Sequence, residues 1–471
     1  MTVGIVKDGQ LIFSKGYGVK EVGKIERPDG NTLYAIASNS KAFTSAMIAQ
    51  LVQEGKLNWN DKVKQYLPYF ELYDPYTSQE VTIRDLLSHR VGLGTFSGDL
   101  IWYKSELSPE DIIKRLQYLP KAYDFRAGYG YSNVMYITAG EVIAKVTGKS
   151  WSQNVQERLL DPLGMQRTIP SISQLEAKGN VATPHAVIEG ETVPIPWVNW
   201  DAVAATGGLI SSTNDIANWM LFNLNGGIWK GDTLLQKNSR NLLWTPHNNF
   251  VVDHTSKNDL NQNFRGYGLG WDLSDFHGRL RVGHTGGYDG MLSSIALLPD
   301  EGIGVVVLTN GTRSPFMAVN HYTLEVLLGI KGKDWSAYLL ERTRQWEKAD
   351  THIADIKSKR QPAIQPTHAL QAYAGRYVAE SYGSIEVKLE RDQLKLHFEH
   401  SPDLAASLHH WHGNVWEIRW DKPQAWFSFG TVHFTLDHNL QISGLEFEVP
   451  NDDFHFQELK AKRVAAAGSV Q

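Results

Sequence analysis

The spacing of apolar residues along the chain changes at Ser38. Before it lies a short apolar run, Tyr34-Ala-Ile-Ala37, which is typical of a strand. After it, apolar residues from Phe43 to Leu51 recur every three or four positions, as they do in a helix with one buried face. The pattern therefore predicts a buried helix that begins at Ser38.

Turn and cap signals place further elements around this helix. Apolar runs over 3–6 and 11–19 flank an Asp8-Gly9 turn and predict an N-terminal hairpin. From about Thr82 to Gly164 the spacing is mostly helical, with Thr82 expected to cap a short helix and Gly148 to end a longer one. We therefore expect a helical layer inserted after the first strands.

Strand-like runs return in the second half of the chain. They cover 270–272, 280–284, 291–298 and 304–308. Together with helical spacing over 316–328, they predict an antiparallel sheet with a helix packed on it. The stretch 168–271 is rich in Gly, Asn and Pro, and such loops commonly form the walls of a substrate pocket.

The C-terminal third has a different pattern. A polar stretch over 347–367 that contains Pro362 and Pro366 predicts a linker. Beyond it, six short runs alternate apolar and polar residues between turns, which predicts a small antiparallel barrel or sandwich. We therefore expect an α+β domain over 1–345, a linker over 346–368 and a β-barrel domain over 369–463.

Composition excludes several functions. A net charge of -5 provides no basic surface for nucleic acid, and the absence of cysteine rules out disulfides, thiol catalysis and cysteine-ligated metals. No apolar run approaches the ~20 residues needed to span a bilayer. The N-terminus lacks the features of a signal peptide. We expect a cytoplasmic protein if Met1 is the true start, and a periplasmic or secreted one if the N-terminus is truncated.

Ser38 and Lys41 are candidates for covalent catalysis. Lys41 lies one helical turn after Ser38, so its amine can return over the Ser38 hydroxyl. Burial favours a neutral amine that accepts a proton, and the N–H groups at a helix start favour a developing oxyanion. On its own, the tetrad also fits a serine N-cap followed by a solvated lysine.

A second candidate sequence, Tyr131-Ser-Asn133, lies between a Gly128-Tyr-Gly130 turn and a predicted helix. A tyrosine so placed can act as a general base if Lys41 stabilises its phenolate. The Asn133 amide can both donate to and accept from an amide substrate. The alternative is a surface turn with a packed tyrosine.

A third candidate sequence, His284-Thr-Gly-Gly287, follows the strand predicted over 280–282. Its glycines would let a substrate backbone lie close to the strand edge. His284 could bind a substrate carboxylate or polarise the site, or it could be a hydrogen-bonded structural residue.

Together the three sequences resemble the motifs of the penicillin-recognising serine hydrolases, in the family's order and with comparable spacing. This family comprises class C β-lactamases, D,D-carboxypeptidases, D-aminopeptidases and related esterases. The resemblance spans 3 to about 328 and includes Leu86-Leu-Ser-His89 and Ala205-Thr-Gly-Gly208. It implies a β-lactamase-like three-layer sandwich, and the C-terminal domain resembles the lipocalin-like barrel of some members.

The resemblance also implies roles for individual residues. Ser38 would form the acyl-enzyme, and Lys41 and Tyr131 would share the proton transfers. The backbone N–H groups of Ser38 and Gly287 would form the oxyanion hole. The substrate-binding residues would be Asn133, His284, Thr285 and Gly286. No metal or organic cofactor is implied, the substrate would be a small molecule or short peptide, and a homo-oligomer stays open.

His284 departs from the β-lactamase pattern. Classical β-lactamases and most D,D-peptidases have lysine at this position, and histidine resembles D-aminopeptidase-like and other peptidase or esterase branches. We expect a peptidase or amidase of the D-aminopeptidase or D,D-peptidase type; the alternatives are a carboxylesterase, a weak β-lactamase and a non-catalytic penicillin-binding scaffold. We expect His284 to act uncharged, because Lys41 would oppose a second cation.

Overall fold

The computed structural model describes residues 1–464, which form two compact units. The first unit contains 1–69, 79–92 and 124–342, and the second contains 70–78, 93–123 and the chain from 343 onward. The stretches 70–78 and 93–123, which the sequence pattern places in the first domain, therefore pack with the C-terminal part of the chain. Local spacing shows that a residue is buried but not which distant segment buries it.

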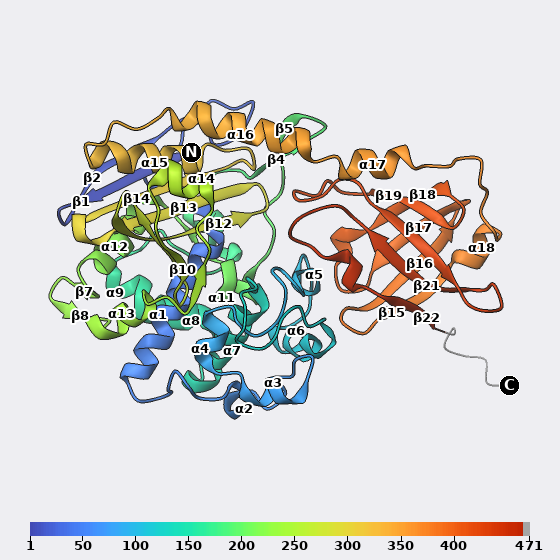
Figure 1. Cartoon of the computed structure of the whole chain (residues 1–471), viewed down its shortest axis with the longest axis horizontal. Helices are drawn as coiled ribbons and strands as arrows, with labels where there is room; N and C mark the ends of the chain where they lie inside the picture. Colours follow the sequence, from blue (N-terminus) through green and yellow to red (C-terminus); the bar gives the residue numbers. More distant parts are fainter. Residues whose placement is uncertain (465–471) are drawn as a thin grey trace. The chain divides into compact units, whose positions relative to one another are not determined.

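The first unit is built on an antiparallel sheet of eight strands (Figure 1). In spatial order these are β2 (Gln10–Gly16), β1 (Thr2–Lys7), β14 (Ile303–Thr309), β13 (Met291–Leu298), β12 (Arg279–Tyr288), β11 (Asp272–Phe276), β10 (Arg265–Tyr267) and β9 (Asn248–Phe250). The N-terminal hairpin pairs with the last strand of the sheet, and Val3 lies opposite Val307. The predicted antiparallel sheet is confirmed, although the three-residue strands β9 and β10 give no signal in the sequence.

Helices cover both faces of this sheet. Helix α15 (Phe316–Leu327) packs on one face, where Leu324 joins a buried cluster with Val305 and Val307 (Figure 1). Helix α12 (Thr213–Leu224) packs on the other face against β1 and β14, and α1 (Ser40–Gln53) lies on the same side. The first unit thus has the layered helix–sheet–helix arrangement that the sequence predicts.

The first unit contains further helices, several of which pack against α1. They are α2 (Val63–Tyr66), α4 (Ile83–Leu87), α7 (Asn133–Thr147), α8 (Trp151–Val155), α9 (Asp161–Leu163), α10 (Leu175–Lys178), α11 (Ala204–Gly207), α13 (Lys237–Leu243) and α14 (His254–Leu260). The predicted ends of two are confirmed: Thr82 and Asp85 form a capping box at α4, and Gly148 ends α7 with a φ of 71°.

Three two-stranded sheets complete the first unit. They are β3 (Tyr34–Ala35) with β6 (Ile210–Ser211), β4 (His185–Ile188) with β5 (Glu191–Pro194), and β7 (Ile228–Trp229) with β8 (Asp232–Thr233). The pair of β3 and β6 brings the Ser38 region next to the Ala205-Thr-Gly-Gly208 stretch.

The second unit contains a closed antiparallel barrel of eight strands in sequence order. They are β15 (Gly375–Ala379), β16 (Gly383–Glu390), β17 (Gln393–Phe398), β18 (Ala406–His412), β19 (Val415–Trp420), β20 (Thr431–Leu436), β21 (Ile442–Glu448) and β22 (Ala461–Val464). The predicted barrel is confirmed. Strands β18 and β22 have no counterpart among the six predicted runs.

One helix outside the barrel lies within the stretch predicted as a linker, and another ends inside that stretch. The set of helices outside the barrel is α3 (Pro75–Glu80), α5 (Asp99–Trp102), α6 (Pro109–Arg115), α16 (Trp335–Ala349), α17 (His352–Ser358) and α18 (Leu370–Tyr373). Within residues 1–464, no helix is both long enough and apolar enough to cross a bilayer.

The segment 93–123 is packed into the second unit by side chains of the barrel. Tyr103 is completely buried, with its ring centroid 4.0 Å from that of Phe454. The Ser401 hydroxyl donates to the Tyr103 carbonyl at 3.1 Å, and Ser97 donates to the Glu458 carboxylate at 2.6 Å. This segment lies in the chain between Gly92 and Asp124, outside the first unit.

Candidate active site

Ser38 lies in a tight turn that the sheet holds in place. It belongs to a single 3₁₀ turn, Ala37–Asn39, directly before α1, so the predicted helix start at Ser38 comes two residues too early. Ala37 has a φ of +47°, which is uncommon for a residue with a side chain. The Asn39 amide donates to Ser293 on β13 at 2.8 Å, and the Ser293 hydroxyl donates to the Ile36 carbonyl at 2.8 Å. These bonds fix the position of the turn.

Lys41 is completely buried beside Ser38. Its Nζ atom lies 3.0 Å from Ser38 Oγ, 2.7 Å from Asn133 Oδ1 and 2.8 Å from the Thr206 carbonyl oxygen. The last two atoms are carbonyl oxygens, which can only accept hydrogen bonds. A neutral amine would donate both N–H groups to them, which leaves its lone pair to accept the Ser38 proton. An ammonium would instead donate its third hydrogen to Ser38.

Tyr131 and Asn133 reach the same point from the start of α7. Nζ of Lys41 lies 4.9 Å from the centroid of the Tyr131 ring. Asn133 Oδ1 accepts from Lys41 and also from the Thr206 hydroxyl at 2.8 Å. Both lone pairs of this oxygen are therefore used inside the protein. In this arrangement Oδ1 serves the protein, and the expected contact of the Asn133 amide with a substrate stays a prediction.

Strand β12 supplies the third sequence. His284 lies within the strand and not after its end, because β12 continues to Tyr288. Strand β11 pairs with β12 only as far as Gly283, whereas β13 pairs with it up to Tyr288. Among the described residues, the stretch 284–288 therefore has a paired strand on one side only. This open edge has the backbone groups to bind an extended chain.

Gly286 is required by packing inside the protein. A Cβ atom at this position would lie 2.3 Å from the Ile36 carbonyl oxygen and 2.5 Å from Ser293 Oγ. Gly286 thus lets β12 approach the turn that carries Ser38. The expectation that this glycine also makes room for substrate stays a prediction.

His284 has a hydrogen-bond partner at each ring nitrogen. Its Nδ1 lies 2.6 Å from the Thr285 carbonyl, so Nδ1 carries a hydrogen and donates it. Its Nε2 lies 3.1 Å from the hydroxyl of Tyr267. Burial and the nearby Lys41 lower the pKa of His284, although the charge of Asp272 opposes them. These contacts fit a neutral imidazole whose Nε2 accepts from Tyr267.

Thr285 differs from His284 in the direction of its side chain. Its side chain points to the opposite face of β12 from that of His284, because successive strand residues alternate. Its carbonyl oxygen is the group that contacts His284. The ring centroids of His284 and Tyr131 lie 6.0 Å apart, so the structure brings together residues from all three sequences.

His89 and Tyr267 support these residues from behind. His89 Nδ1 accepts from the Ser132 backbone N–H at 3.0 Å, and its carbonyl accepts from the Gly130 N–H at 3.0 Å. The ring of His89 lies 4.4 Å from that of Tyr131 and 4.7 Å from that of Tyr267. The sequence does not predict a role for Tyr267, because Tyr267 reaches His284 through the pairing of separate strands.

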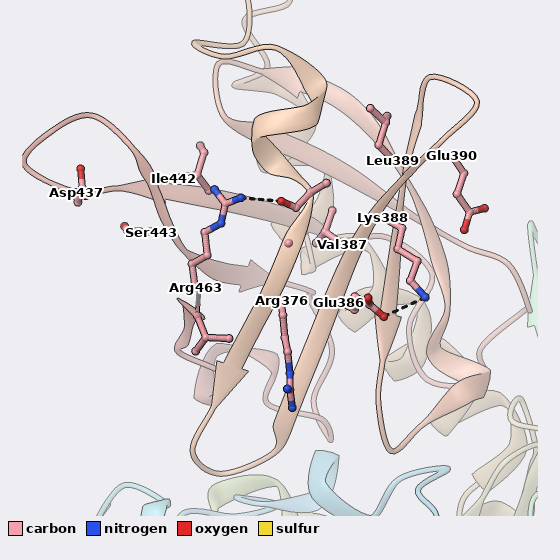
Figure 2. Close-up of a pocket in the computed structure, with 13 residues that line it drawn as sticks. Arg376, Glu386, Val387, Lys388, Leu389, Glu390, Asp437, Ile442, Ser443 and Arg463 are labelled. Atoms are coloured by element: carbon pink, nitrogen blue, oxygen red, sulfur yellow. Dashed lines mark hydrogen bonds and ion pairs between the residues drawn. The ribbon is translucent and has the colours of Figure 1, made fainter. Parts of the chain in front are cut away.

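A separate pocket lies on the outside of the barrel, next to β15, β16, β21 and β22 (Figure 2). Its volume is about 910 Å³. The charged side chains there bond locally: Lys388 lies 3.0 Å from Glu386, and Arg463 donates to the Ala374 carbonyl at 2.7 Å. The pocket contains no residue from the three candidate sequences.

Both parts of the chain match known families. Residues 1–329 match the beta-lactamase family, and residues 359–463 match a domain of unknown function, DUF3471. The second match does not bear on the lipocalin-like resemblance, which stays a prediction.

Relatives match across much of the chain. An unguisins hydrolase of Aspergillus violaceofuscus is 27% identical over 430 residues, which are 83% of this chain and 74% of that protein. Protein flp of Staphylococcus aureus is 32% identical over 321 residues, which are 65% of this chain and 58% of that protein.

Two solved structures share the fold. An octameric penicillin-binding protein homologue from Pyrococcus abyssi superposes with a TM-score of 0.62 over 95% of this chain and 94% of that one, at 22% identity. A penicillin-binding protein from Bacillus halodurans gives a TM-score of 0.56 over 68% of this chain and 95% of that one, also at 22% identity. From its match over residues 1–329, this chain belongs to the beta-lactamase family and is a serine hydrolase.

Proposed function

We propose that this serine hydrolase is a peptidase or amidase that forms its acyl-enzyme on Ser38. The observation that carries the proposal is the position of Lys41, whose Nζ atom binds two carbonyl oxygens and Ser38 Oγ together. A buried amine held in this way is a base for the serine hydroxyl.

The first half of the reaction acylates Ser38. Lys41 takes the Ser38 proton while Oγ attacks the substrate carbonyl. The backbone N–H groups of Ser38 and Gly287 stabilise the oxyanion, each donor typically being worth ~3 kcal/mol. Tyr131, next to Lys41, passes the proton to the leaving amine, and the C–N bond breaks.

The second half releases the acyl group. Water enters after the amine leaves, and the same two residues, Lys41 and Tyr131, remove its proton as it attacks the ester carbonyl. Collapse of the second tetrahedral intermediate frees a carboxylic acid and returns the proton to Ser38. Each step moves one proton between groups of the site.

The open edge of β12 supports a peptide-like substrate. An extended acyl group could pair with 284–288 as an added strand, while Asn133 Nδ2 donates to a substrate carbonyl. The names of two similar proteins, the unguisins hydrolases of Aspergillus violaceofuscus and Aspergillus campestris, are consistent with hydrolysis. A neutral His284 favours D-aminopeptidase-like substrates over penicillins, whose carboxylate would need a cation.

A substrate panel tests the proposal. The purified enzyme is assayed on amides and dipeptides of D- and L-amino acids, on p-nitrophenyl esters and on penicillins, and kcat/KM is compared. We expect hydrolysis of amide or peptide bonds with Ser38→Ala inactive. Turnover of esters alone would make the enzyme a carboxylesterase, and turnover of penicillins above all other substrates would make it a β-lactamase.

A further inference from the structure

Tyr267 is a buried residue without a role in the reaction described above. It ends β10 and is completely buried. Its ring lies against those of His89, at 4.7 Å, and Tyr131, at 6.4 Å between centroids. Its hydroxyl lies 3.1 Å from His284 Nε2. Tyr267 therefore contacts the histidine of the third candidate sequence.

The direction of this hydrogen bond follows from the groups around it. His284 Nδ1 must donate, because its partner is the Thr285 carbonyl oxygen. Burial raises the pKa of Tyr267 well above its ordinary value, so its phenol keeps its hydrogen. The hydroxyl can then donate to Nε2 only if that nitrogen is unprotonated. One neutral tautomer of His284, with hydrogen on Nδ1, satisfies both partners.

We propose that Tyr267 is a positioning residue that holds His284 as the neutral Nδ1–H tautomer and thereby directs the enzyme to substrates with no carboxylate next to His284. The inference rests on the proposed function of the site. The substrate class is an acyl donor whose group at this place is uncharged, such as an amide, an ester or an internal peptide bond.

The charged and titratable groups near His284 support the same selection. From α1, Lys41 disfavours a second positive charge, and the buried His89 ring lies within electrostatic range. From β11, the acidic group Asp272 acts in the opposite direction and favours a charged His284. A substrate carboxylate would meet an imidazole with both nitrogens engaged, so it would lose water without gaining a donor. Binding it would require Nε2 to gain a proton and the Tyr267 hydroxyl to turn away.

The variant Tyr267→Phe tests the assignment, because it removes the hydroxyl and keeps the buried ring. Tyr377→Phe in the barrel is the matched control: Tyr377 is also completely buried, and its hydroxyl donates to the Tyr373 carbonyl at 2.8 Å. The substrates are alanyl-alanine and its C-terminal amide, in the D or L form that wild type cleaves. They differ only in a carboxylate.

We expect wild type and Tyr377→Phe to prefer the amide. In Tyr267→Phe the preference should fall about tenfold, the effect expected from one lost buried hydrogen bond. The change should appear mainly in KM of the carboxylate substrate, and the alkaline limb of its kcat/KM profile should move to higher pH, because His284 without the Tyr267 hydroxyl keeps a proton more easily. Equal preferences and equal pH profiles in all three proteins would overturn the proposal.

A second measurement does not depend on turnover or on the variant. Nitrogen NMR of 15N-histidine-labelled wild type, with His284→Gln to assign the resonances, reports which ring nitrogen carries hydrogen. We expect a protonated Nδ1 and an unprotonated Nε2 at neutral pH. A cationic ring or hydrogen on Nε2 would overturn the proposal even if the enzyme is active. Absence of hydrolysis with the expected tautomer would count against the proposed function instead.

Discussion

The side-chain oxygen of Asn133 accepts a hydrogen bond from Nζ of Lys41 at 2.7 Å, deep inside the first unit. The bond joins the helix after Ser38 to the helix after Tyr131. A neutral oxygen in this place can bind the lysine both as ammonium and as amine. The acid–base role of Lys41 therefore depends on the absence of a negative charge at Asn133.

Replacing Asn133 with aspartate should place a negative charge next to Lys41. The side chains have the same shape, but the added carboxylate favours the ammonium form of Lys41. An adjacent opposite charge typically changes the pKa of a group by about 1–3. We therefore expect kcat/KM at pH 7 to fall about hundredfold and to recover as the pH rises. Steady-state pH profiles check this. Thr206→Val, which removes only the second donor to Asn133, is the control, and an unshifted profile in Asn133→Asp would contradict the role of Lys41.

His89 should set the position of the Tyr131 loop. It has a φ of +57°, and its Nδ1 accepts from the Ser132 N–H. His89→Ala leaves that N–H without its acceptor, which typically costs about 1–3 kcal/mol of stability, and should lower kcat. His89→Asn places an oxygen near the Nδ1 position and tolerates positive φ, so it should recover much of both losses. Thermal unfolding and kcat are measured for both variants. If His89→Asn is no more stable and no more active than His89→Ala, His89 does not have this role.

Asp85 should be a main source of acid sensitivity in the first unit. Its buried carboxylate accepts from Arg126 at 2.7 Å, from Arg90 at 2.6 Å and from the Thr82 hydroxyl at 2.6 Å. Burial alone would raise the pKa of Asp85, but the bonds from Arg126 and Thr82 and the charge of Arg90 outweigh it, and the pKa is lowered. The stability from this group is present above the unfolded value of ~3.9 and is lost as pH falls below it.

Asp85→Asn should destabilise the protein by about 3 kcal/mol, near the low end for a broken buried ion pair, because the Arg126 side chain is 40% exposed. In this variant the free energy of unfolding should also depend less on pH below about pH 4. Urea unfolding at several pH values measures both effects. Glu54→Gln, which breaks a partly exposed pair with Arg158, is the control and should cost less than about 1 kcal/mol. Equal losses in the two variants would contradict this account of Asp85.

Removal of the C-terminal barrel should damage the rest of the protein. The polar linker predicts that a chain ending near residue 367 folds alone, whereas the structure buries Tyr103 of segment 93–123 against Phe454. Without the barrel, this aromatic surface is exposed, and exposed apolar patches promote aggregation. Light scattering and dye binding of a 1–367 chain check this. A monomer with wild-type activity would instead support the independent hydrolase domain over 1–345 that the linker pattern predicts.

Local signals in the sequence predict the elements well. The Thr82 cap, the end of α7 at Gly148 and the strands β13 and β14 follow from short stretches with strong preferences. The antiparallel sheet, the barrel and the three candidate sequences follow in the same way. Strands β9, β10, β18 and β22 do not, because their pairing partners decide their conformation.

The contacts that support the site residues could not be predicted from the sequence, for a related reason. Tyr267 and Thr206 act through hydrogen bonds to His284, Lys41 and Asn133, which are distant in the chain. The position of Ser38 one turn ahead of α1 depends on Ser293, on a strand more than 250 residues away. The residue types in the sequence predict the chemistry of the site. The contacts that position those residues depend on tertiary packing.

Formation of a covalent acyl-enzyme on Ser38 is the central claim, and mass spectrometry tests it most directly. The enzyme is treated with a fluorophosphonate, its intact mass is measured, and the labelled peptide is sequenced. Ser38→Ala is the control; its fold should persist, because the change removes a hydroxyl that hydrogen-bonds to Lys41, and a typical hydrogen bond contributes about 1 kcal/mol. We predict one adduct per chain in wild type, located on Ser38, and none in Ser38→Ala. An adduct on another residue, or equal labelling of the folded Ser38→Ala variant, would contradict the claim.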